Sequence, residues 1–191
     1  MRGEVLIVNK ENAGLPAARK TGLEHATGDY VYHVDPDDWL SPGSLEAIVA
    51  KCRETDADIV YFNYVKEYSN RSSVKKEREY SIEQKNEYIR NMYNHRAFGT
   101  LCNKCVKRSL YEHVHHPKYS YAEDCFLSVQ LVGYALESMT SCSQSPPSLE
   151  TQTVASFEGV PKYPPACSKV KYALMPAGIS MSGEMSQLSE A

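Results

Sequence analysis

An acidic cluster follows a strand-like run near residue 35, and its chemistry suits a divalent cation. The sequence HVDPDDWL spans residues 33–40 and places Asp35, Asp37 and Asp38 within four residues. Two unit charges about 4 Å apart repel by roughly 1 kcal/mol in water and by more inside a protein, so clustered carboxylates are unfavourable unless something offsets their charge. Mg²⁺ does so and is commonly held by one or two carboxylates together with substrate phosphates. The cluster therefore predicts a cation site that neutralises a diphosphate group.

The same residues also suit a plain turn. Asp and Pro are common turn residues, and Asp38 could cap the helix that follows. An EF-hand is excluded, because the glycine and the closing glutamate of that calcium loop are missing. Taken alone, the D-x-D-D pattern leaves both the cation site and the turn open.

Cysteines and histidines form a second group of metal-ligand types. Cys102 and Cys105 have C-x-x-C spacing, and His113, His115 and His116 follow. No second C-x-x-C and no regular H-x-x-x-H completes a zinc set. We therefore expect reduced thiols that pack as small apolar groups, and a zinc site is the less favoured interpretation.

The elements that must position the acidic cluster alternate between strands and helices. Short apolar and β-branched runs indicate the strands, and apolar residues at helical spacing indicate the helices. The predicted strands are 4–8, 30–34 and 58–65, and the predicted helices are 17–27, 43–55, 82–93, 103–113 and 123–136. The polar stretch 67–80 is expected to form a hairpin or an excursion. This order predicts an α/β fold with a mostly parallel sheet flanked by helices, in which ligands bind beyond the carboxyl ends of the strands.

The charge balance excludes one class of partner. Of the 191 residues, 21 are Lys or Arg and 24 are Asp or Glu, giving a net charge of -3. This balance offers no electrostatic reason to expect nucleic acid as a partner. The apolar run at the start is too short for a signal peptide, and no apolar segment is long enough to span a membrane. These features predict a cytoplasmic protein.

The run NAGLPAARKTGLEHATGDYVYHVDPDDWLSP, residues 12–42, resembles the family 2 glycosyltransferases with the GT-A fold. The family pattern is N-x-G-x-x-x-A-R-N-x-G, a helix, A-x-G-x-Y, a strand and D-x-D-D-W. The matching residues are Asn12, Gly14, Ala18, Arg19, Gly22, Ala26, Gly28, Tyr30, Asp35, Asp37, Asp38 and Trp39.

The resemblance implies roles for several of these residues. The family's acidic motif binds Mg²⁺ or Mn²⁺ and, through the metal, the diphosphate of a nucleotide sugar. This role falls to Asp35, Asp37 and Asp38. The resemblance also implies that Asn12, Gly14, Arg19 and Asp35 bind the sugar donor. A fixed cation beside a diphosphate is chemically sensible, although an ordinary surface ion pair would also suit Arg19.

Two later segments extend the likeness. Residues 99–104, GTLCNK, resemble the family's G-x-x-W-N-K, and residues 121–126, YAEDCF, contain an acidic pair that resembles the one in its G-E-D-x-x-F. The family's acidic pair opens a helix under the acceptor pocket, which implies Asp124 as the general base that deprotonates the acceptor hydroxyl. The alternative for Asp124 is an ordinary helix cap.

The resemblance is incomplete. Lys20 and Ala122 replace an asparagine and a glycine of the family pattern, and the segment 99–104 lacks the family's tryptophan. The chain also starts after the strands that grip the nucleotide base in the family, so a shortened enzyme is expected. The likeness implies a partial catalytic domain over 1–136, and the Ser- and Pro-rich range 137–191 is predicted to be an irregular or disordered tail.

The resemblance implies transfer of a sugar, with inversion, from a nucleotide-diphosphate sugar to a hydroxyl group. The expected acceptor is a glycan or a lipid-linked glycan used in polysaccharide biosynthesis. Such an acceptor would bring the protein to the inner face of the membrane by peripheral association. Two alternatives stay open, namely a non-catalytic remnant of such an enzyme and, less favoured, a nucleotidyltransferase.

Overall fold

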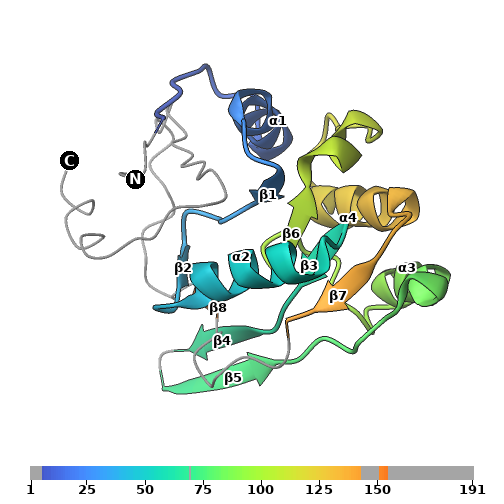
Figure 1. Ribbon diagram of the computed structural model, residues 1–191. Coiled ribbons are helices and arrows are strands. Elements are labelled where there is room, and N and C mark those ends of the chain that lie inside the picture. The colour runs from blue at the N-terminus through green and yellow to red at the C-terminus, as the bar shows by residue number, and fades with distance from the viewer. Residues whose placement is uncertain (1–5, 69, 143–150, 155–191) are drawn as a thin grey trace.

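The computed structural model describes residues 6–68, 70–142 and 151–154 and shows an α/β fold built on two four-stranded sheets (Figure 1). The helices are α1 (Leu15–His25), α2 (Ser44–Thr55), α3 (Lys85–Tyr93) and α4 (Glu123–Tyr134), with 3-10 turns η1 (Ile82–Gln84) and η2 (Arg108–Glu112). The strands are β1 (Tyr30–Tyr32), β2 (Asp38–Leu40), β3 (Ile59–Tyr61), β4 (Tyr64–Tyr68), β5 (Arg71–Lys75), β6 (Lys104–Lys107), β7 (Met139–Ser141) and β8 (Thr151–Val154). The predicted mixture of strands and flanking helices is thus present.

The central sheet has the strand order β1-β6-β3-β7. Strand β6 runs antiparallel to both of its neighbours, while β3 and β7 are parallel. Val31 pairs with Val106, and Val106 pairs with Ile59, so these three side chains line one face of the sheet. Since side chains alternate along a strand, Val60 and Cys105 point to the opposite face.

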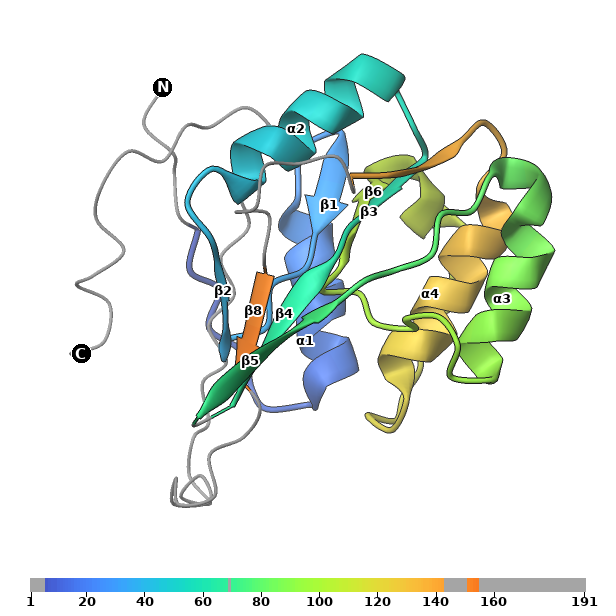
Figure 2. The same cartoon turned by 90° about the horizontal axis from the view of Figure 1, so that it is seen from below.

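Helices cover both faces of this sheet (Figure 2). On one face, Ile48 and Cys52 of α2 pack on Val60 and Cys105. On the other, Tyr88 and Met92 of α3 and three residues of α4 belong to the larger hydrophobic cluster. Leu23 of α1 also packs against this cluster. The sheet is therefore an inner layer, and its edges and strand ends are where polar side chains can gather.

The second sheet has the order β2-β8-β4-β5 and leaves the central sheet at a bend after β3. The single strand predicted over 58–65 is divided there into β3 and β4. Phe62 N donates to Asn103 O at 3.1 Å, and Asn103 Nδ2 donates to Phe62 O at 3.3 Å. At the bend, these two hydrogen bonds to Asn103 take the place of the regular hydrogen bonds between paired strands. The expected hairpin within 67–80 corresponds to the antiparallel pair β4 and β5.

The predicted helix over 103–113 is wrong. Its first part is strand β6, which fills the gap between β1 and β3, and only 108–112 turns, as η2. Lys104, Cys105 and Val106 are all buried, so both faces of this strand are covered and it lacks the alternation of polar and apolar residues that indicates a strand. Tertiary pairing outweighed local propensity here.

The strand predicted over 4–8 is not found in its described part. Residues 6–8 have no regular structure, and the side chains of Leu6 and Ile7 are 48% and 55% exposed. Without a paired neighbour, an apolar run does not form a strand. Residues 4 and 5 lie outside the described part.

The range predicted as an irregular tail, 137–191, contains two described strands. β7 is an edge strand of the central sheet and pairs with β3, and β8 lies between β2 and β4. The rest of this range beyond 142 lies outside the described residues. No described helix is long and apolar enough to cross a membrane.

Candidate functional site

Helix α1 carries the cation at the centre of the site. Gly14 precedes it with φ of 83°, a conformation that favours glycine, and its N–H donates to Asn12 Oδ1 at 3.0 Å. Pro16 suits the first helical turn, where a missing N–H costs nothing. A Cβ on Gly14 would lie 3.1 Å from Ser120 Oγ, so the loop before α1 touches the loop before α4. This contact brings the start of α1 close to the start of α4.

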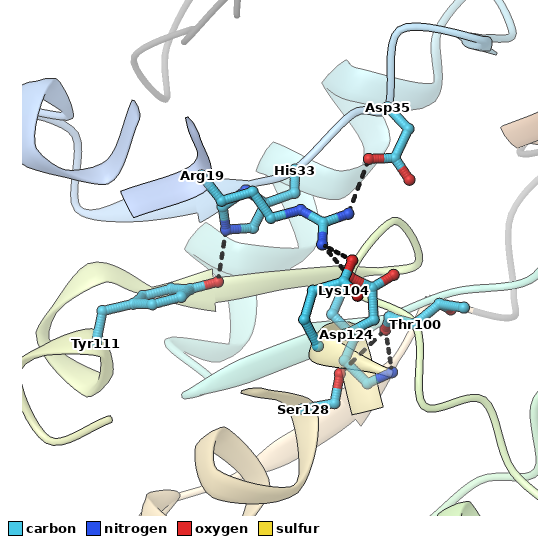
Figure 3. A network of polar contacts seen from close by, with 9 residues as sticks. Arg19, His33, Asp35, Thr100, Lys104, Tyr111, Asp124 and Ser128 are labelled. Atoms are coloured by element: carbon cyan, nitrogen blue, oxygen red, sulfur yellow. Dashed lines mark hydrogen bonds and ion pairs between the residues drawn. The ribbon is translucent and has the colours of Figure 1, made fainter. Parts of the chain in front are cut away.

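Arg19 of α1 binds three carboxylates at once (Figure 3). Its Nη2 donates to Asp35 Oδ1 at 2.9 Å, and its Nη1 donates to Glu123 Oε1 at 2.8 Å and to Asp124 Oδ1. The Arg19 side chain is only 2% exposed. Arg19 thus joins the acidic loop after β1 to the acidic pair that opens α4.

The charges around Arg19 do not balance. One guanidinium faces the carboxylates of Asp35, Glu123 and Asp124, which leaves a formal charge of −2 when all are ionised. Burial raises the pKa of Asp124 to about 6; Arg19 opposes this, while Glu123 and Asp35 add to it. Asp124 is therefore a carboxylate at neutral pH but a stronger base than an ordinary aspartate, as a general base requires.

The acidic loop forms a tight turn. Asp38 N donates to Asp35 O at 3.0 Å, and residue 38 begins β2. Asp37 is exposed at the turn, whereas Asp35 and Asp38 are partly buried. The turn expected from the residue types is thus present. It is joined to the Arg19 cluster through the carboxylate of Asp35.

A ready-made metal cage is not found in the described part of the chain. There, no group of three or more His, Cys, Asp or Glu side chains could hold a metal ion. Asp35, Asp37 and Asp38 therefore do not converge on one point, since turn geometry separates neighbouring side chains. Carboxylate oxygens beside an excess charge of −2 still fit a hard divalent cation that takes its other ligands from a phosphorylated substrate. No zinc set forms at Cys102 and Cys105, both of which are buried.

A partly buried histidine supports the acidic loop. His33, two residues before Asp35, lies 3.1 Å from the Tyr111 hydroxyl through its Nε2, and the two rings pack edge to face. Burial lowers the pKa of His33 to about 3, and the charge of Arg19 contributes. His33 is therefore neutral at physiological pH and acts as a fixed hydrogen-bonding spacer between β1 and η2.

The structure brings together some of the predicted site residues. Arg19 bonds to both Asp35 and Asp124. The resemblance implied a role at the donor for Asp35 and a role at the acceptor for Asp124. Asn12 and Gly14 lie at the start of α1 and contact each other. Sequence reasoning missed Glu123 as a partner of Arg19. It also missed His33 and Tyr111, for which no pattern in the sequence gave a signal.

Comparison with known proteins identifies a family over the part of the chain that contains Arg19 and the acidic turn. The model of the family "Glycosyl transferase family 2" matches residues 4–114. Glycosyltransferase GlyA of Streptococcus pneumoniae serotype 4 is 45% identical over 64 residues, which are 34% of this chain and 9% of the relative. The putative glycosyltransferase EpsH of Bacillus subtilis is 28% identical over 109 residues, covering 56% of this chain and 31% of the relative.

A third relative has a more specific name. The minor teichoic acid biosynthesis protein GgaB of Bacillus subtilis is 38% identical over 45 residues, covering 24% of this chain and 5% of the relative. In these three comparisons the chain spans less than a third of the length of the relatives it matches.

Proposed function

Because this chain belongs to glycosyl transferase family 2, we propose that it transfers a sugar from a nucleotide-diphosphate sugar to a hydroxyl acceptor. One observation carries the proposal. Arg19 holds the acidic loop after β1 and the carboxylate of Asp124 in one cluster, so a donor-side and an acceptor-side group lie next to each other. A transferase needs this proximity, because both substrates must meet at one carbon atom.

In this proposal Asp124 is the general base. It accepts the proton of the acceptor hydroxyl while that oxygen attacks the anomeric carbon of the donor. The bond from the anomeric carbon to the diphosphate oxygen breaks, and the nucleoside diphosphate leaves with the electron pair. A single displacement from the opposite face inverts the configuration at that carbon. The raised pKa of Asp124, about 6, supports the base role.

Asp35, Asp37 and Asp38 are proposed to hold Mg²⁺ or Mn²⁺ together with the donor. When bound, the ion would neutralise the charge that develops on the leaving diphosphate. Asp37 is the exposed carboxylate of the turn and is therefore the most available ligand. Asp35 would share its carboxylate with Arg19, and this bond fixes one side of the loop.

The proposed part of Arg19 in donor binding is indirect. Both of its terminal nitrogens bind carboxylates, and the side chain is 2% exposed. We assign it the orientation of Asp35 and Asp124 in place of direct contact with the diphosphate. Asn12 and Gly14 are proposed to bind the donor, and their position at the N-terminal end of α1, where helix N–H groups favour anions, supports this role.

The proposed acceptor is a glycan or a lipid-linked glycan. The name of GgaB supports a cell-surface polymer such as teichoic acid as the product class. Such an acceptor would place the reaction at the cytoplasmic face of the membrane, by peripheral association. The alternative is that the chain is a non-catalytic remnant of such an enzyme. In that case the folded chain would transfer no sugar.

A donor screen tests the proposal. The chain is incubated with Mn²⁺, a set of nucleotide sugars and a lipid-linked glycan extract, and release of nucleoside diphosphate is measured. Transfer by the wild type that is lost in Asp124→Asn supports the proposal. Absence of release with every donor from a chain that melts cooperatively contradicts it and favours the remnant.

A further inference from the structure

The segment 98–104 lies against the start of α4 and has no role in the chemistry described so far. It contains the Gly99 and Asn103-Lys104 positions of the G-x-x-x-N-K motif and leads into β6. Lys104 is 1% exposed, although a lysine is almost never fully buried unless it is paired. A buried ammonium in this segment therefore requires a reason.

The Lys104 ammonium closes the segment on itself. Its Nζ donates to Phe98 O and Thr100 O, both at 2.7 Å, and to Asn103 Oδ1 at 3.0 Å. All three N–H groups of the ammonium are thus used. Burial lowers the pKa of Lys104 to about 8, so the group still carries its charge at pH 7. The backbone between residues 98 and 103 is therefore folded around one cation.

A buried carboxylate anchors the beginning of the segment. Glu77 Oε2 accepts from Phe98 N at 2.8 Å, and Glu77 N donates to Asn63 Oδ1 at 2.8 Å. Glu77 is 7% exposed, and Lys104 lowers its pKa against the larger, raising effect of burial. The segment is consequently held at both ends by the protein interior.

The fixed segment touches the first turns of α4 at two points. A Cβ on Gly99 would lie 3.0 Å from both Cβ and Sγ of Cys125 and 3.3 Å from its Cα, so a side chain here would require Cys125 or the segment to shift. Ser128 Oγ, one turn further along α4, donates to Thr100 O at 3.3 Å. Cys125 directly follows Asp124, and Figure 3 shows Thr100, Lys104 and Ser128 in the same network as Asp124.

We propose that Gly99 and Lys104 position Asp124: the segment folded around Lys104 is a rigid support on which the first turn of α4 rests. Lys104 touches no substrate in this proposal and is a positioning residue. The inference rests on the proposed function, because it assigns the support to a general base. It adds a role for the G-x-x-x-N-K motif, which donor and metal binding leave without one.

The test substitutes two glycines that differ in surroundings. Gly99→Ala places a methyl group against Cys125, whereas Gly133→Ala adds one on the same helix with nothing within 4 Å. We expect Gly99→Ala to lower kcat at least about tenfold while the donor KM stays within about twofold, because the base moves and the donor site does not. Gly133→Ala should leave both parameters unchanged. Equal kcat values for the two variants in a chain that transfers sugar would overturn the inference.

A second pair of variants separates positioning from a folding defect. Cys125→Gly removes two of the three atoms that the new methyl group would meet. The double variant Gly99→Ala/Cys125→Gly should therefore have a higher kcat than Gly99→Ala. The single variant Cys125→Gly is the reference that shows the effect of losing the cysteine by itself. Lys104→Met removes the ammonium and should lower kcat with little change in donor KM. Failure of the double variant to recover any activity would contradict the steric part of the proposal.

Hydrogen exchange provides a measurement that needs no activity. Amides of residues 123–128 should exchange at least about fivefold faster in Gly99→Ala and Lys104→Met than in the wild type or Gly133→Ala. Unchanged exchange rates in both variants would contradict the proposal that segment 98–104 supports the first turn of α4. Absence of sugar transfer by the wild type would instead contradict the proposed function, and exchange would still decide whether the segment holds α4.

Discussion

At the scale of single residues, Arg19 is the centre of the site. It is buried among Asp35, Glu123 and Asp124, and a buried cation that loses its partners, or partners that lose their cation, destabilise a fold strongly. The sequence indicated that Arg19, Asp35 and Asp124 have functional roles. It could not indicate that they meet, because Arg19 and Asp124 are 105 positions apart and the contact depends on how α1 and α4 pack.

Replacing Asp124 should separate activity from stability. The folded-state pKa of Asp124, about 6, exceeds its usual value of 3.8, so the proton that stabilises the folded state is lost as pH rises through 6. Asp124→Asn keeps the neutral form, and we expect it to raise the stability above pH 7 by up to about 3 kcal/mol. Near pH 3.5 the two proteins should melt alike.

The measurement is a thermal melt of both proteins at pH 8 and pH 3.5, alongside the transfer assay. Activity should fall by at least about a hundredfold in Asp124→Asn. A Tm of the variant well below that of the wild type at pH 8 would show that the bond from Arg19 to Asp124 outweighs the cost of burying the charge.

The pH dependence of transfer should report the same carboxylate. A general base must be deprotonated, so kcat should be constant above the pKa of Asp124 and fall about tenfold per pH unit below roughly pH 6. The profile is measured at saturating donor and Mn²⁺ between pH 4.5 and 8. An acid limb near pH 4 with no change at 6 would be inconsistent with the burial of Asp124.

Arg19 should not tolerate lysine. Lysine carries its N–H groups on one nitrogen, whereas arginine directs one terminal nitrogen to Asp35 and the other to Glu123 and Asp124. We expect Arg19→Lys to destabilise the fold by roughly 2–4 kcal/mol. Lys20→Met is the matched control, because the neighbouring Lys20 is 56% exposed in a loose pair with Glu24 and should change stability by less than about 0.5 kcal/mol. Denaturant melts that rank the two variants equally would contradict this reading of the cluster.

At the scale of elements, patterns with a local cause were predictable. The periodic helices α1, α2 and α4 and the acidic turn follow from spacing, proline and turn residues. Strand β6 was not predictable, since its buried run suits a helix equally well and only its pairing with β1 and β3 decides. The division of 58–65 into β3 and β4 likewise depends on Asn103, which lies far along the chain.

The packing of α2 on the sheet provides a test at this scale. Ile48 is fully buried against Val60 and Cys105, so Ile48→Ala should cost about 2–5 kcal/mol of unfolding free energy. Glu46, exposed on the same helix, is the control, and Glu46→Ala should cost less than about 0.5 kcal/mol. Urea melts decide between the two. A small effect of Ile48→Ala would mean that α2 is not part of the cooperative core.

At the scale of the whole molecule, the fold divides the proposed reaction between two parts of the chain. The segment from α1 to the acidic turn supplies the donor side, and α4 with its support at 98–104 supplies the acceptor side. Arg19 joins the two parts through its bonds to Asp35 and Asp124. Since the chain spans only a fraction of the relatives it matches, the central claim is that these parts suffice to bind a donor.

Isothermal titration with nucleoside diphosphates tests this claim most directly. UDP, GDP, CDP and dTDP are titrated with and without Mn²⁺ into the wild type, Asp37→Ala and Asp29→Ala, where Asp29 is an exposed carboxylate before β1. We predict binding of at least one nucleotide that requires Mn²⁺, is lost in Asp37→Ala and is kept in Asp29→Ala. No binding by a folded wild type, or binding that Asp37→Ala leaves unchanged, would contradict a metal-dependent donor site at the acidic turn.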